Sequence, residues 1–235
     1  MVRSRQAFEQ QLTQLQERLL EMGAFVQTML DRSMRALVEH DLALAHEVIV
    51  ADDTADEMDL DIEKQCMRLL ALQQPMSADL RLIGTVLKVI ADVERIGDYS
   101  VDIAKTAIKL ADTEYFKPLV DIPRMAEMVR AMLGRALEAL VEKDLDIVMQ
   151  VVDSDDEVDK MWYALLDELE GLMEQRPEVV RQAVAFLLVA RYLERIADHT
   201  VNIAERVAYM VTGRFEALAP SHRADYQPDD NQPSE

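Results

Sequence analysis

Glu94-Arg95-Ile96-Gly97-Asp98-Tyr99-Ser100-Val101-Asp102-Ile103-Ala104 is the stretch that decides the fold, because it returns one hundred residues later. The second copy, residues 194–204, reads ERIADHTVNIA, and seven of its eleven positions are identical to the first. The shorter stretch LVEHDL at residues 37–42 likewise returns as LVEKDL at residues 140–145. Two such recurrences at nearly the same distance indicate that the chain arose by internal duplication of a unit of about one hundred residues.

The sequence of each unit predicts three long helices. In the first unit, apolar residues recur at spacings of three and four over about residues 5–39, 41–73 and 78–110, the pattern of a helix that packs on neighbours. Asp41 and Ser77 are the predicted N-caps of the second and third helices. Gly and Pro are scarce, with 6 and 7 residues, which argues against a fold of many short strands. The sequence predicts an all-α protein of two tandem, similar three-helix bundles, six long helices in all.

The domain boundaries follow from the break between the copies. The first bundle is predicted at residues 5–112 and the second at residues 124–214, joined by a linker at residues 113–123 that contains two prolines. Residues 215–235 are polar, acidic and contain three prolines, and they are predicted to be a disordered tail.

Charge and composition exclude several classes of protein. The chain has 25 Lys and Arg against 45 Asp and Glu, a net charge of −20, which disfavours binding to nucleic acid or anionic lipid. No run of about 18 apolar residues is present, so no membrane insertion is expected. The single cysteine, Cys66, has apolar neighbours at helical spacing and is predicted to be a core residue. These features predict a cytoplasmic protein.

Acidic residues interrupt the apolar seams at equivalent positions of the two copies. Glu94 and Glu194 stand where the third helix of each unit should present an apolar residue, and an aspartate follows one turn later. The second helix of each unit shows a similar pair, so the candidate metal ligands are Asp52, Asp56, Glu94 and Asp98 in the first unit and Asp155, Asp159, Glu194 and Asp198 in the second. Unpaired buried carboxylates are costly, and clustered carboxylate oxygens suit Fe, Mn, Mg or Ca. The hypothesis is one carboxylate-bridged metal cluster in each bundle.

Two other interpretations stay open. In a chain this acidic, pairs of acids four residues apart arise by chance, so the protein could be a structural helical scaffold with solvated acids. A ferritin-like storage protein or oxidase would combine glutamates with Glu-x-x-His, yet none of the four histidines follows a glutamate at that spacing. His199 is expected at the surface. Phosphate-binding loops, dinucleotide motifs and nucleophile elbows are absent, so no catalytic or organic-cofactor residues are predicted.

The run LQQPMSADLR at residues 72–81, followed by ERIGD at residues 94–98 and ERIAD at residues 194–198, resembles the PhoU family of phosphate-signalling regulators. The resemblance covers about residues 5–215 and implies two similar three-helix bundles. The family's metal-binding pattern, Glu/Asp-x-x-x-Asp on two helices of each bundle, falls on the eight acids named above. It implies a divalent or trivalent ion: iron, manganese, zinc or magnesium. This chain departs from the pattern at Ala197, and Asp102 opposite Asn202 is expected to make the two clusters unequal.

The resemblance also implies a function and partners. PhoU-like proteins are negative regulators of the phosphate-starvation response and of phosphate uptake, so the resemblance implies a regulator and not an enzyme. They are cytoplasmic adaptors that couple the ATPase subunit of the phosphate ABC transporter to a sensor histidine kinase. The resemblance therefore implies a homodimer that reaches the inner face of the membrane through its partners, not by insertion.

Overall fold

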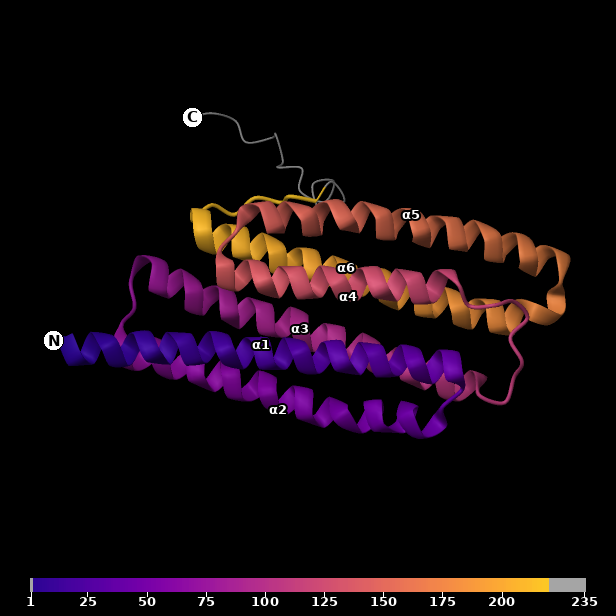
Figure 1. Cartoon of the computed structure of the whole chain (residues 1–235), viewed down its shortest axis with the longest axis horizontal. Helices are drawn as coiled ribbons and strands as arrows, with labels where there is room; N and C mark the ends of the chain where they lie inside the picture. Colours follow the sequence, from indigo (N-terminus) through magenta and orange to yellow (C-terminus); the bar gives the residue numbers. More distant parts are fainter. Residues whose placement is uncertain (1, 220–235) are drawn as a thin grey trace, which may run out of the picture.

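The computed structural model describes residues 2–219, and side chains from residue 5 onward, as an assembly of six long helices (Figure 1). The helices are α1 (Val2–Glu39), α2 (Leu42–Gln73), α3 (Ser77–Leu110), α4 (Asp121–Glu142), α5 (Leu145–Gln175) and α6 (Val180–Thr212), with the short 3₁₀ helix η1 (Pro177–Val179) before α6. The predicted all-α architecture is confirmed. Among these described helices, none combines the length and apolar character needed to cross a bilayer.

The helices form two three-helix bundles that share one long contact. Helices α1, α2 and α3 pack on one another, as do α4, α5 and α6. The most extensive contact between elements joins α3 to α6, which run antiparallel through the middle of the molecule, and α1 lies beside α4 (Figure 1). The central helix of each bundle therefore packs against two helices of its own repeat and against the other central helix.

The seams read from the sequence form the core. Leu15 and Val26 of α1 have no exposed surface, and most of the apolar residues along α3 and α6 are also buried. These apolar stripes are exposed at their N-terminal ends, where Leu80 is 47% and Val180 is 39% exposed. Cys66 is fully buried among these residues, and burial raises the pKa of its thiol to about 12. Cys66 is therefore a core residue, as predicted.

The repeated LVExDL stretch is a tight turn between helices. His40 and Lys143 adopt left-handed backbone angles, with φ of 56° and 57°, and end the preceding helices. Asp41 then caps α2 by accepting a hydrogen bond from the backbone N–H of Leu44 at 3.0 Å, and Asp144 caps α5 in the same way. The prediction for Ser77 was wrong. Ser77 is the first residue of α3, and the N-cap position is Met76, which has no side-chain cap.

Polar side chains fix the α3–α6 contact. Asp92 of α3 accepts hydrogen bonds from His199 Nδ1 at 2.9 Å and from Asn202 Nδ2 at 3.2 Å. Arg81 Nε donates to the carbonyl oxygen of Met210 at 3.2 Å, near the end of α6. The His199 side chain is 21% exposed, so it does not lie free at the surface as expected but joins the two bundles.

The connection between the repeats packs on both of them. Tyr115 donates a hydrogen bond to the carbonyl oxygen of Leu37 at 2.6 Å, and its ring lies 4.3 Å from that of His40. Phe186 of α6 packs edge-on against Tyr115 and stacks on Phe116. Helix α4 begins at Asp121, within the predicted linker.

A short non-helical segment follows α6, and we call residues 214–219 the strap. Gly213 ends the helix with φ of 74°, and the chain folds back so that the N–H groups of Leu218 and Ala219 donate to Glu205 Oε1 at 2.6 and 3.4 Å. Ala219 is buried. Residues 215–219 of the predicted disordered tail are thus packed on α6, and the remainder of that prediction, residues 220–235, lies outside the described residues.

The packing of the inter-repeat connection predicts a large effect of Phe186→Ala. Phe186 is 1% exposed and supports both Tyr115 and Phe116, so its truncation should lower the free energy of unfolding by about 3–5 kcal/mol, measured by chemical denaturation. The control is Phe215→Ala, at a ring that is 54% exposed, with an expected loss below about 1 kcal/mol. Equal losses in the two variants would contradict this account of the connection.

Candidate functional site

The four predicted acids of the first repeat lie near one another on α2 and α3. Burial raises the pKa of Asp52, and the negative charges of Asp98 and Asp56 raise it further. Burial likewise raises the pKa of Glu94, with added repulsion from Asp98 and Asp56. Two of these repulsions act between α2 and α3, so the acids of the two helices are near neighbours, while Asp56 remains exposed.

Two cations lie at this first group of acids. Arg95 contacts Glu94 at 3.4 Å and Asp98 at 2.7 Å. Lys105 lowers the pKa of Asp52, but its Nζ is paired with Asp102 at 3.4 Å and its side chain is 52% exposed. Both cations therefore sit in solvent beside the carboxylates.

The second repeat buries its acids more deeply, between α5 and α6. Asp155 is 2% exposed and Glu194 is 8% exposed, while Asp159 and Asp198 are partly buried. Burial raises the pKa of Glu194 to about 7, the charges of Asp198 and Asp159 add to the rise, and two arginines oppose it. A carboxyl with this pKa changes its charge near neutral pH.

The two arginines that oppose this rise come from α6 itself. Arg191 makes a very short ion pair with Glu194 Oε1, and its guanidinium carbon lies 5.8 Å from the ring centroid of Trp162 on α5. Arg195 contacts Asp198 at 3.6 Å. An arginine placed over an aromatic ring is held in position, so Arg191 is a fixed counter-charge for Glu194.

Glu194 shows whether these residues suit a cation. Its Oε1 is paired with Arg191, but its Oε2 is buried and accepts no hydrogen bond from any described residue. A buried carboxylate oxygen without a partner is costly, and a proton or a metal ion would satisfy it. The chemistry of the acids therefore fits a hard cation. Within the part of the chain that the structure describes, no three or more His, Cys, Asp or Glu side chains yet converge on one point that could hold a metal ion.

Two acids beside the sites were missed in the sequence. Asp59 lies one turn after Asp56, and its charge adds to the rise in the pKa of Glu94. Burial and the charges of Glu63 and Asp56 raise the pKa of Asp59 itself. Asp59 lies on the same helical stripe as Asp52, so its position in the sequence could have identified it as a neighbour of the site. Glu205, which is 5% exposed, continues the stripe of Glu194 and Asp198, but its partner is the strap, which no helical spacing identifies.

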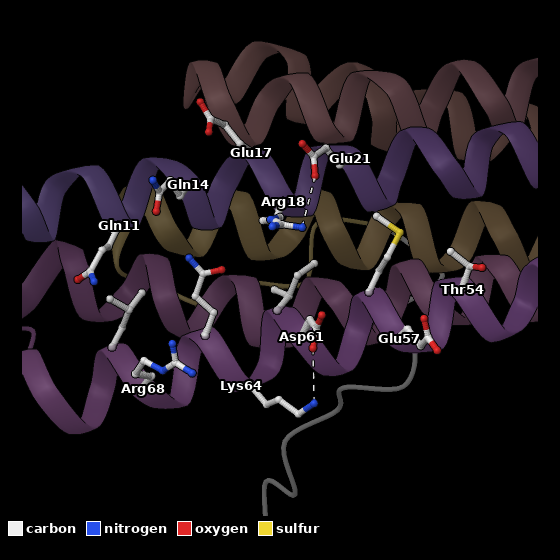
Figure 2. Close-up of a pocket in the computed structure, with 14 residues that line it drawn as sticks. Gln11, Gln14, Glu17, Arg18, Glu21, Thr54, Glu57, Asp61, Lys64 and Arg68 are labelled. Atoms are coloured by element: carbon white, nitrogen blue, oxygen red, sulfur yellow. Dashed lines mark hydrogen bonds and ion pairs between the residues drawn. The ribbon is translucent and has the colours of Figure 1, made fainter.

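A polar groove of about 700 Å³ runs between α1 and α2, on the side of α2 opposite the carboxylates (Figure 2). Its charged walls include two ion pairs, Arg18 with Glu21 at 4.0 Å and Asp61 with Lys64 at 3.5 Å. Each ion pair lies within one helix, the first pair on α1 and the second on α2. Figure 2 shows the two pairs on opposite walls of the groove. The acids and bases of the groove nearly balance, so it does not select an ion by its charge.

The chain matches known proteins over both repeats. The PhoU domain matches residues 19–107 and again residues 122–207. A protein of Clostridium acetobutylicum, named phosphate-specific transport system accessory protein PhoU homolog, is 38% identical over 212 residues, which cover 90% of this chain and 97% of the relative. A protein of the same name from Aquifex aeolicus is 37% identical over 205 residues, 87% of this chain and 93% of the relative.

Solved structures agree with the sequence matches. The crystal structure of PhoU from Pseudomonas aeruginosa superposes with a TM-score of 0.85 at 35% identity, and it covers 88% of this chain and all of the other. The crystal structure of the phosphate transport system regulatory protein PhoU from Streptococcus pneumoniae also gives 0.85, at 29% identity over 90% of this chain and all of the other. On the strength of both repeats, the chain belongs to the PhoU family.

Proposed function

We propose that this protein is an accessory regulator of phosphate-specific transport that represses the phosphate-starvation response when phosphate is plentiful. The observation that carries the proposal is the match of both repeats to the PhoU domain, together with 38% identity to a relative named as a phosphate transport accessory protein. The protein acts through its contacts and not by catalysis.

Its partners in this role are the ATPase subunit of the phosphate ABC transporter and the sensor histidine kinase of the phosphate two-component system. The protein works as a cytoplasmic homodimer and reaches the membrane through these partners. Long helices with exposed outer faces, including the groove between α1 and α2, offer surface for more than one contact. The net charge of −20 favours partners with basic surfaces.

Each bundle holds a metal ion or cluster through its four acids: Asp52, Asp56, Glu94 and Asp98 in the first, and Asp155, Asp159, Glu194 and Asp198 in the second. Iron, manganese, zinc and magnesium all suit oxygen ligands of this kind. The bound ion supplies the positive charge that buried carboxylates need. The raised pKa of Glu194 and its unpartnered Oε2 support this assignment.

Deleting the gene tests the regulatory role. Expression from a phosphate-starvation promoter should rise at least several-fold in phosphate-rich medium, because the repressing input is lost, and a wild-type copy should restore repression. The measurement is a transcriptional reporter compared in phosphate-rich and phosphate-poor medium. A reporter that stays repressed in the deletion strain would contradict the proposed function.

Metal content tests the carboxylate sites. The full chain, purified without a histidine tag, should lose most of its bound metal on the double substitution Glu94→Ala and Glu194→Ala, measured by elemental analysis. The control is Glu17→Ala and Glu57→Ala, at two acids of the groove on the other side of α2. Equal metal content in the wild type and the first double variant rules out the sites.

The pKa of Glu194 predicts how the metal-free protein responds to pH. The folded protein holds this proton up to about pH 7, whereas the unfolded chain releases it near the ordinary value of 4.5, so stability falls as pH rises through that interval. Glu194→Gln should remove this part of the fall, on the order of 1 kcal/mol or more, in denaturation curves at pH 5 and pH 8. A variant whose pH dependence matches that of the wild type would contradict the assignment.

A further inference from the structure

Two of the positions at which the carboxylate sites differ lie beside the acids and are related by the duplication. Trp162 in the second repeat occupies the place of Asp59 in the first, at the 103-residue offset of the second helices. Arg191 occupies the place of Ala91, at the 100-residue offset of the third helices. An aromatic ring and a cation thus replace a carboxylate and a methyl group beside otherwise equivalent acids.

In the second repeat these two residues act together on Glu194. The indole of Trp162 supports the guanidinium of Arg191, and that guanidinium is bonded to Glu194 Oε1. The Arg191 side chain is 38% exposed, whereas that of Glu194 is 10% exposed. Arg191 therefore approaches the buried carboxylate from the solvent side and covers one of its two oxygens.

In the first repeat the same neighbourhood is negative. Ala91 carries no charge, and Asp59 adds its repulsion to that of Asp56 and Asp98 on Glu94. Lys105, which has no basic counterpart in the second repeat, is exposed and paired with Asp102, so solvent screens it.

Arg95 contacts Glu94 at 3.4 Å and Asp98 at 2.7 Å, whereas Arg195 contacts Asp198 at 3.6 Å. The Arg95 side chain is 59% exposed and that of Glu94 is 26% exposed, so solvent screens this pair more than it screens Arg191 with the more deeply buried Glu194.

We infer that Arg191 is an internal counter-ion of the second site, which an incoming metal ion must displace, so that the first site fills at a lower metal concentration than the second. The inference rests on the proposed metal sites. A charge-assisted pair to a buried carboxylate separates the two affinities by roughly tenfold or more. Asp59 acts in the opposite sense, because an additional carboxylate strengthens cation binding at the first site.

The fluorescence emission of Trp162 reveals the order in which the two sites fill. Trp162 is the sole tryptophan of the chain, and its ring contacts the guanidinium that must move when the second site is filled. A metal ion bound between α2 and α3 leaves this contact in place. Emission from Trp162 therefore reports the second site alone, whereas the total amount of bound metal reports both.

The test is a titration of the metal-free full chain with manganese(II). Bound manganese is counted from the loss of the free-ion EPR signal, and Trp162 emission is recorded on the same samples. In the wild type, the first ions should bind without changing the emission, and the emission should change only at roughly tenfold higher free manganese.

Arg191→Met keeps a long unbranched side chain but removes its charge and with it the contact that Trp162 reports, so this variant is followed by EPR alone. Its manganese binding should collapse into a single phase at the concentration of the first phase. Arg191→Lys, which keeps the positive charge, should leave the two phases at separate manganese concentrations.

Two further variants keep the inference testable should Arg191→Met not fold. Asp59→Asn should weaken only the phase that leaves emission unchanged, and Ala91→Arg should weaken that same phase by placing an arginine beside Glu94. Coincident phases in the wild type, or manganese binding that stays in two phases in a folded Arg191→Met protein, overturn the inference while leaving the metal sites standing. A wild-type chain that binds no manganese, nor any metal in elemental analysis, overturns the metal sites and this inference together.

Discussion

The antiparallel contact between α3 and α6 is the constraint on which the rest of the structure depends. Each of these helices is already covered on two sides by helices of its own bundle, so the contact between them adds a third buried face. Polar groups set its alignment: Asp92 accepts from His199 and Asn202, and Arg81 reaches the last turn of α6. These partly buried polar pairs form in only one alignment of the two helices, which fixes how the two bundles lie on each other.

This arrangement explains where the acids can lie. Because α3 and α6 share their inner faces, their remaining seams face α2 and α5, and the carboxylates occupy those seams. Glu94 and Glu194 therefore lie against a neighbouring helix. For this reason burial is the largest cause of the rise in the pKa of both glutamates. The cost of burial is greater in the second repeat, where Asp155 is also almost fully buried. That same repeat supplies Arg191 as a counter-charge.

Local patterns predicted most of the fold, and contacts distant in sequence account for what was missed. The helices follow from apolar periodicity, and the Asp41 cap from a single residue next to a helix start. The prediction for Ser77 was wrong because serine alone does not show where the first helical residue falls. His199 was placed at the surface because spacing on one helix does not reveal a partner such as Asp92 on another. The eight acids were predicted from four seam positions and from the aspartate one turn after each, whereas Arg191 and Trp162 were not singled out because their contact crosses from α6 to α5.

The two repeats have the same apolar seams, but the residues around these seams differ between them. Helix α1 has 38 residues and α4 only 22, and the connection between the repeats packs beside α5 where α4 is short. There Lys117 bonds Glu168 at 2.6 Å, whereas Gln65, at the equivalent position of α2, lines the open groove between α1 and α2. The carboxylate sites diverge in the same manner, since the acids persist in both copies while their neighbours change from Asp59 and Ala91 to Trp162 and Arg191. On the proposal that both groups of acids bind a metal ion, the different charges beside them give the two sites different affinities for the same ion, so the protein would respond in two steps where two identical units would respond in one.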